Sequence, residues 1–175
     1  METLSRIFAT LALVAANGFF VVAEFAAVTA RETRLEAMAN KNAIARLALK
    51  IKAKLDLYLS SCQLGVTLTS LGLGAVIGPA VATLIEPMLH GFRLSPHTVG
   101  VISLTIGFAL STMLHIVIGE QAPKNWAIRY ADRALLAVAL PLFIFTYIFY
   151  PAIWMLNAMT RLVLQASGIH INYEK

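Results

Sequence analysis

Four stretches of this 175-residue chain carry almost no charge, and each is long enough to form a helix that crosses a membrane. They cover residues 7–30, 57–85, 99–118 and 134–160, and Glu24 is the one charged residue among them. Crossing the hydrocarbon core of a bilayer takes about 20 predominantly apolar residues. Only 13% of the chain is charged, about half the usual share in soluble domains. The sequence therefore predicts an all-α integral membrane protein.

The first stretch is expected to be a retained span and not a cleaved signal peptide. Its apolar run is too long for a signal peptide, and Glu24 lies inside it. The segment before it is not basic, because Glu2 offsets Arg6.

The distribution of Lys and Arg predicts the orientation of the spans. Residues 31–54 hold half of the chain's 14 basic residues, and short loops of this kind stay in the cytoplasm. The connection 87–97 carries only Arg93 and is expected outside. We therefore expect a multi-pass protein of the bacterial inner membrane with its N-terminus outside. Contact of the basic loop with anionic lipid accounts for most of the net charge of +5, and nucleic-acid binding is not expected.

The fourth stretch is not expected to be a simple span. Pro141 and Pro151 divide it into pieces of about ten residues, and proline interrupts helices because it lacks a backbone N–H. Aromatic residues typical of head-group depth bracket it: Trp126, Tyr130, Tyr147, Tyr150 and Trp154. We predict three spans and then a proline-broken juxtamembrane helix, at about residues 5–30, 57–86, 98–120 and 134–167. Three crossings place the C-terminus in the cytoplasm, whereas four would place it outside.

Glycines mark the second stretch as bent or broken and as a place for close helix contact. Gly74 and Gly78 have the G-x-x-x-G spacing that lets backbones approach, and Pro79 follows them. A gating role and a packing role stay open for both glycines. In the third stretch small residues recur every four positions and predict a second close contact: Ser103, Gly107, Ser111, His115 and Gly119.

The basic loop alternates apolar and charged residues in a pattern that predicts one or two short amphipathic helices at the inner membrane surface. Two roles are open for them, as a static membrane anchor or as elements that move during gating.

Polar residues inside the spans form stripes that lipid cannot satisfy. Thr10, Asn17, Glu24 and Arg31 lie seven residues apart, which keeps them near one helix face. The second span carries Ser60, Gln63, Thr67, Ser70 and Gly74 within one sector. The simplest packing is a three-helix bundle around a polar cavity near its cytoplasmic half.

The third stretch ends in Gly119-Glu120-Gln121-Ala122-Pro123-Lys124, which places an acid, a helix breaker and a base at the mouth of a span. Intramembrane carboxylates are costly and mark functional sites. Pro123 is expected to interrupt the helix and to free carbonyl groups for an ion.

Hard oxygen donors dominate the predicted cavity and favour Mg²⁺, Ca²⁺ or Na⁺. The candidate ligands are Asn17, Glu24, Thr67, Ser70, Gly119 and Glu120, and the candidate gating or structural residues are Gly74, Gly78, Pro123 and Lys124. Cys62 is the only cysteine and is interpreted as a packing residue. His115 is interpreted as a hydrogen-bonding residue and not as a ligand.

Several ordered motifs resemble the transmembrane domain of the CorC/cyclin M family of magnesium transporters. They are Asn17-Gly18-Phe19-Phe20-Val21-Val22-Ala23-Glu24-Phe25-Ala26, the segment from Tyr58 to Gly74, and the segment from Gly119 to Lys124. The resemblance extends over residues 5–169, followed by a polar tail at 170–175. It implies a homodimer of three-span subunits and Mg²⁺ transport, with sodium-coupled export the expected form. Relatives continue into cytoplasmic nucleotide-binding modules, which this sequence does not contain.

Three positions depart from the family pattern and bear on the choice of ion. Val21 and Ala23 stand where members with defined magnesium sites resemble a Phe-Phe-Ser-x-Ser-Glu pattern, so two hydroxyl ligands are missing. Gly78 stands where the closest branch has glutamate. A site with fewer ligands is expected to hold partly hydrated Mg²⁺ or to select another cation.

The leading hypothesis is a cation transporter that works by alternating access around Glu120. An exporter of organic polycations and a non-transporting membrane regulator or scaffold are the alternatives. Enzymatic activity is not expected, because the spacing of His115 and Glu120 differs from the H-E-x-x-H motif of zinc proteases and no nucleophile motif is present.

Overall fold

The computed structural model describes residues 2–89 and 95–167, except for the side chains of residues 2–7, 77–84 and 86–88. Within these ranges the chain is helical and contains no strand. The elements are α1 (Glu2–Thr29), α2 (Glu32–Ala39), α3 (Ala43–Ala53), α4 (Leu55–Leu89), α5 (Pro96–Leu114), η2 (His115–Gln121), α6 (Ala122–Arg129), α7 (Ala131–Ile148) and α8 (Tyr150–Ala166). The all-α prediction is confirmed.

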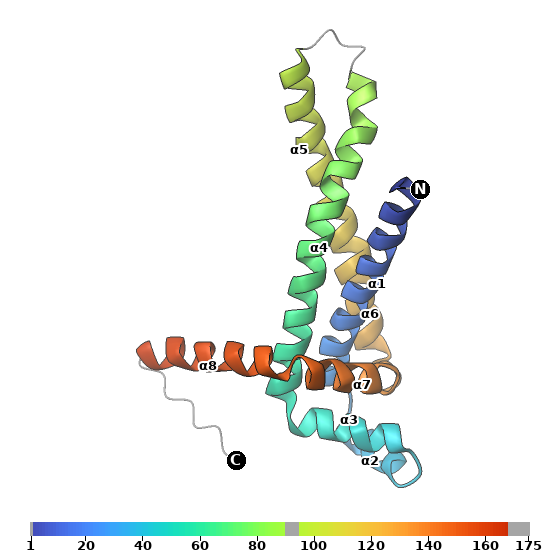
Figure 1. Ribbon diagram of the computed structural model, residues 1–175. Coiled ribbons are helices and arrows are strands. Elements are labelled where there is room, and N and C mark those ends of the chain that lie inside the picture. The colour runs from blue at the N-terminus through green and yellow to red at the C-terminus, as the bar shows by residue number, and fades with distance from the viewer. Residues whose placement is uncertain (1, 90–94, 168–175) are drawn as a thin grey trace.

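Three long rods stand side by side, and the remaining helices gather at one of their ends (Figure 1). The rods are α1, α4 and the continuous run from α5 through η2 to α6. α7 and α8 lie across the lower end of the rods, and α2 and α3 lie below them. By length and composition four of the described helices could cross a membrane, α7 among them. The crosswise course of α7 agrees with the predicted juxtamembrane helix.

α4 is a single helix of 35 residues, so of the two forms predicted for the second stretch, bent or broken, the broken one is wrong. The helix contains Gly65, Gly72 and Gly74 and continues through Pro79. α1 and α5 lie against α4 along much of its length. This tertiary packing outweighs the low helix propensity of the glycines, which costs about 1 kcal/mol each.

Only one of the two prolines in the fourth stretch coincides with a break. α7 ends at Ile148 and α8 begins at Tyr150, with Pro151 in the first turn of α8, where a missing N–H costs nothing. Pro141 lies inside α7, which corrects the prediction of two interruptions. The helix persists because it buries side chains on both sides of this proline: Ala134, Leu135, Val138, Ala139, Leu142 and Thr146.

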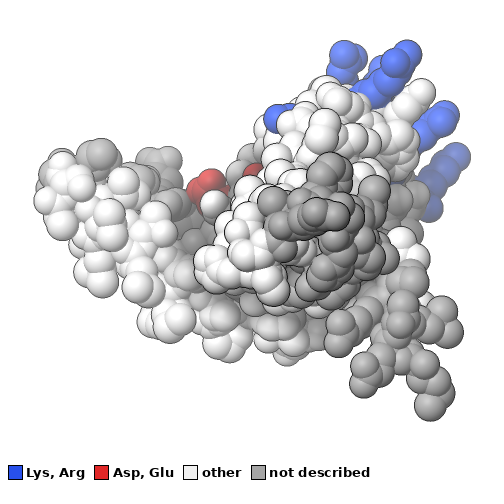
Figure 2. Space-filling view, turned by 90° about the horizontal axis from the view of Figure 1, so that it is seen from above, with Lys and Arg blue, Asp and Glu red and all other residues white. Residues whose placement is uncertain are grey.

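The basic loop forms two short helices, α2 and α3, as predicted. Asn42 caps α3 by accepting hydrogen bonds from the backbone N–H groups of Ile44 (2.8 Å) and Ala45 (3.4 Å). Asp132 at the start of α7 accepts a bond from the Arg31 N–H (2.9 Å) and pairs with Arg34 (3.1 Å). Seen from above, the Lys and Arg side chains gather along one edge of the molecule (Figure 2).

The apolar core lies where α1 meets the short helices and α7. A row of alanines on α1 is almost fully buried there and lets the neighbouring helices approach closely: Ala23, Ala26, Ala27 and Ala30. Leu35, Ile51 and Leu135 complete the centre of this cluster. Large apolar residues on α5 and η2 instead face outward, among them Leu104, Phe108, Met113 and Val117. A soluble monomer rarely exposes such a surface, which suits lipid.

The small-residue stripe of the third stretch is buried as predicted. Ser103, Gly107, Ser111 and Gly119 all lie on the protected face of this rod. Their spacing of four residues keeps them aligned over α5.

Candidate cation site at the π-helical turn

The helix continues through Pro123, which corrects the prediction of a break at this residue. α5 passes into a π-helical segment, η2, and then into α6, with Pro123 in the first turn of α6. The N–H of Ala122 bonds to the carbonyl of Val117, five residues back. The wider turn thus lets the helix accommodate Pro123 without a break. π-helical turns are rare and occur frequently at functional sites.

The π-turn also explains why His115 and Glu120 meet. Two residues five apart on an α-helix point about 140° away from each other, since each residue turns the helix by about 100°. The wider π-turn places residue i+5 over residue i. His115 Nε2 lies 3.0 Å from Glu120 Oε1, and the two side chains are 16% and 40% exposed. This contact is therefore a product of the widened turn.

Asn17 of α1 reaches across to the same turn. Its Nδ2 donates a hydrogen bond to the carbonyl of Gly119 (2.9 Å), and the side chain is fully buried. In an α-helix, the Gly119 carbonyl would accept from the N–H of residue 123, which is a proline and has none. The Gly119 carbonyl thus lacks this α-helical partner, and it accepts from Asn17 instead.

Two hydroxyls of α4 hold the other end of the Asn17 amide. Thr69 Oγ1 and Ser70 Oγ lie 2.8 Å and 3.2 Å from Asn17 Oδ1. Ser70 Oγ is also 3.4 Å from His115 Nε2, which links the network to Glu120. Asn17, Gly119, Ser70 and Glu120 thus converge from three rods, whereas Thr67 of the predicted polar stripes lines another pocket.

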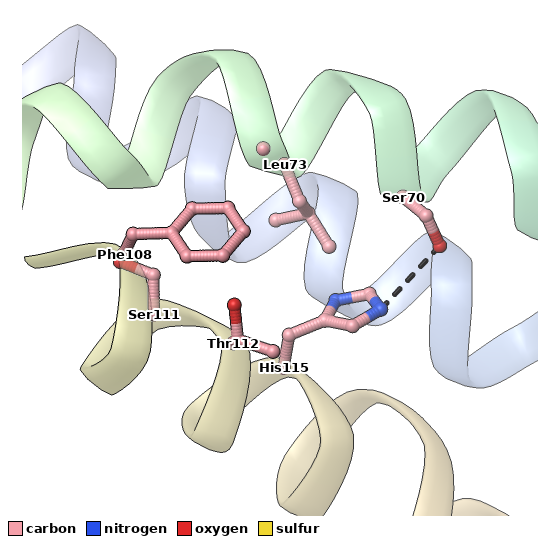
Figure 3. Close-up of a pocket in the computed structure, with 7 residues that line it drawn as sticks. Ser70, Leu73, Phe108, Ser111, Thr112 and His115 are labelled. Atoms are coloured by element: carbon pink, nitrogen blue, oxygen red, sulfur yellow. Dashed lines mark hydrogen bonds between the residues drawn. The ribbon is translucent and has the colours of Figure 1, made fainter. Parts of the chain in front are cut away.

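Figure 3 shows the pocket beside this network, with His115 directed toward Ser70 and Phe108 opposite Leu73. The pocket has a volume of about 190 Å³ and is lined by Ser70, Leu73, Gly74, Phe108, Ser111, Thr112 and His115. Its walls are mainly apolar. The Nδ1 atom of His115 is buried and makes no hydrogen bond to the described residues.

A side chain at Gly119 would be crowded. An added Cβ would lie 3.1 Å from Asn17 Nδ2 and 3.4 Å from His115 Nδ1. A second close approach joins α1 to α6, where a Cβ on Gly18 would lie 3.2 Å from Pro123 Cγ. Glycine at these positions lets the α1 backbone approach the π-turn.

Glu24 lies apart from the Asn17 network. It is seven residues further along α1, about 10 Å at 1.5 Å per residue, and its charge interacts with that of Lys124. The Lys124 ammonium lies 4.6 Å from the centroid of the Phe25 ring. The structure thus connects Lys124 to α1 and does not bring the two carboxylates together.

Thr67 faces a different pocket from Asn17, because it lies two residues, or about 200°, from Thr69 on the helix. It lines a polar pocket of about 290 Å³ between α4 and α8. Ser60, Gln63 and Asn157 belong to the same pocket, and Ser60 donates a hydrogen bond to Asn157 Oδ1 (2.7 Å). Asn157 was not among the predicted residues, although an amide in an apolar helix is a sequence feature that could have identified it.

Among the described residues, Gly74 has open space around it, and Val21 and Ala23 lie in the core. None of the described residues lies within 4 Å of a Cβ built on Gly74, so this residue makes no tight contact with them. Gly65 does make a tight contact, because a Cβ there would collide with the Phe20 ring. The surroundings of Gly78 lie outside the described residues. Val21 and Ala23 are buried and offer no oxygen to the site.

The donors present suit a cation that keeps part of its water. No three His, Cys, Asp or Glu side chains come together within the described ranges. One carboxylate, a hydroxyl and a carbonyl remain as oxygen ligands at the π-turn. Mg²⁺ commonly binds through one or two carboxylates and retains several waters.

The sequence matches the model of the cyclin M transmembrane N-terminal domain over residues 8–175. The chain belongs to this family. It is therefore a multi-pass membrane protein of a family associated with Mg²⁺ transport. Membership confirms the resemblance seen in the sequence motifs.

Curated relatives from Bacillus subtilis (strain 168) match most of the chain. UPF0053 protein YhdT is 40% identical over 160 residues, which are 90% of this chain and 34% of the relative. UPF0053 protein YrkA is 38% identical over 172 residues, 97% of this chain and 39% of the relative. The chain thus spans well under half the length of these two relatives.

Proposed function

We propose that this domain moves a divalent cation, Mg²⁺, across the bacterial inner membrane by alternating access around Glu120. The observation that carries the proposal is the convergence of Glu120, Ser70, Asn17 and the Gly119 carbonyl from three rods at a π-turn. Export is the proposed direction, with Na⁺ as the coupling ion and the N-terminus outside. The transporting unit is a homodimer, as the family resemblance implies.

The cation reaches this site through the polar pocket between α4 and α8. Ser60, Gln63 and Thr67 follow one face of α4 toward Ser70, which belongs to the next pocket along the same helix. Lipid offers no partner for the Gln63 amide, so water is the suitable occupant of this pocket. Thr67 accordingly serves on the path of the ion, beside its proposed role as a ligand. Glu24 lies further along α1 as a second acid available to the ion.

Binding at the proposed site is tested by thermal unfolding of the purified domain with MgCl₂, CaCl₂ or NaCl at matched ionic strength. A ligand at 100 times its dissociation constant stabilises the folded state by about 2.7 kcal/mol. We expect saturable stabilisation by Mg²⁺ in the natural sequence and none in Glu120→Gln. Glu36→Gln on the exposed surface of α2 is the matched control and should respond like the natural sequence. An equal Mg²⁺ response in Glu120→Gln would place the site elsewhere.

One observation favours the second candidate, export of an organic cation. The pocket beside Glu120 is lined mainly by apolar side chains, including Leu73 and Phe108. An aliphatic polyamine would use such walls along its methylene groups and a carboxylate at its ammonium group. Stabilisation by a polyamine, with no response to divalent metal, would favour this candidate.

A further inference from the structure

A second pocket lies where α6 turns into α7, at the end of the three rods. It has a volume of about 280 Å³ and is lined by Arg34, Arg129, Tyr130, Ala131, Asp132 and Arg133. Tyr130 ends α6 and precedes the first residue of α7. The change of direction at this tyrosine brings Arg129 and Arg133 to the same pocket, and α2 contributes Arg34.

The charges around this pocket do not balance. Three arginines and a single carboxylate, Asp132, line the pocket, and this carboxylate is already engaged. One of its oxygens accepts from the Arg31 N–H (2.9 Å) and the other from Arg34 (3.1 Å). Within the described ranges neither Arg129 nor Arg133 forms an ion pair. Arg129 and Arg133 therefore leave two positive charges at the pocket, which favour the binding of an anion.

The surroundings indicate which anion. Trp126 and Tyr130 are both nearly half exposed, and their ring centroids lie 6.2 Å apart. Aromatic residues of this kind mark the depth of lipid head groups. Ile128, two residues before Tyr130 on α6, is also exposed. A molecule bound here would have a phosphate at the arginines and apolar chains beside these exposed side chains of α6.

We propose that this pocket binds the phosphate of an anionic phospholipid head group. Arginine suits phosphate because its planar guanidinium offers two parallel N–H donors. Basic pockets between membrane helices on the cytoplasmic side recognise phospholipid head groups in this way. The site is independent of the cation site, since the two share no residue.

The first test measures lipid binding to the purified domain by native mass spectrometry. We expect phosphatidylglycerol to bind in preference to phosphatidylcholine. The double variant Arg129→Gln/Arg133→Gln should weaken phosphatidylglycerol binding on the order of 10-fold, because each basic residue near an anionic lipid contributes to the free energy of binding. The control Lys41→Gln/Lys50→Gln removes the same charge from the α2–α3 region. Equal weakening by both double variants would overturn the proposal, because it would reveal diffuse attraction only.

Two further arms keep the result interpretable. Arg129→Lys/Arg133→Lys retains the charge and tests the guanidinium geometry, and it should bind the lipid less tightly than the natural sequence. Inorganic phosphate, titrated against thermal unfolding, separates a free anion from a lipid. Stabilisation by phosphate without selective retention of phosphatidylglycerol would overturn the lipid assignment. Monodisperse elution of each variant confirms that it is folded.

Discussion

At the scale of single residues, the site depends on groups that are small or lack a donor. Pro123 supplies no N–H, so the Gly119 carbonyl is open to Asn17, and Gly119 has no side chain to block that approach. The Asn17 amide then donates one N–H to Gly119 and accepts from Thr69 and Ser70. A buried amide needs such partners, and these contacts supply them at both its nitrogen and its oxygen.

The steric argument predicts opposite effects for two glycines. Gly119→Ala should destabilise the domain by about 1–3 kcal/mol, because its Cβ would press on Asn17 Nδ2 and leave buried polar groups unpaired. Gly74→Ala should be neutral or stabilising by up to about 1 kcal/mol, because the space around it is open and alanine favours the helix. Thermal unfolding in detergent measures both. Comparable destabilisation by the two variants would refute the steric account.

At the scale of elements, the sequence predicted which helix faces pack together. It did not predict the π-turn, which changes the direction in which side chains point around the site. The small residues from Ser103 to Gly119 identified the buried face of the third rod correctly. The π-turn was missed because one extra residue per turn leaves no mark in an apolar pattern. Thr69 and Thr67 are equally polar in the sequence, and only the placement of Asn17 decides that Thr69 is the inner one. Distances between rods, which decide such choices, are not encoded in residue spacing.

The polar pocket between α4 and α8 makes a prediction for this pair of elements. Thr67→Cys should react with a hydrophilic thiol reagent at least about 10-fold faster than Val117→Cys, because thiols ionise in water and not in lipid. Val117 is 50% exposed on η2 and lies at a similar depth, since Ser70 meets His115. Cys62 is fully buried, so the natural sequence supplies the background rate. Equal rates would mean that Thr67 faces lipid, and self-crosslinking would mean that a second copy covers it.

At the scale of the whole molecule, the prediction of three crossings rests on the course of α7. This helix is apolar enough to span a bilayer, yet it lies across the ends of the other three (Figure 1). Hydropathy alone does not distinguish these cases, whereas the two prolines and the aromatic residues did point to a juxtamembrane helix. Pro141 nevertheless does not break α7, because packing against the core outweighs one missing hydrogen bond.

The prediction of three crossings would put the two ends of the described chain on opposite sides of the membrane. In a Cys62→Ala background, His97→Cys should react with an impermeant maleimide on intact cells, whereas Ser167→Cys should react only after permeabilisation. Both residues are exposed in the structure. Labelling of both variants on intact cells would indicate four crossings and would move α7 into the bilayer.

Because α4 is one unbroken helix, the way it fits the membrane depends on the thickness of the bilayer. A helix of 35 residues is about 52 Å long at 1.5 Å per residue, whereas the hydrocarbon layer is about 30 Å thick. α4 must therefore tilt, project into the aqueous phase or thicken the surrounding bilayer, and each adjustment carries a modest cost per ångström of mismatch. Because α5 lies against α4, we expect a change in the tilt of α4 to displace the rod that carries the π-turn. We therefore expect the chain length of the surrounding lipid to affect the segment that holds Glu120.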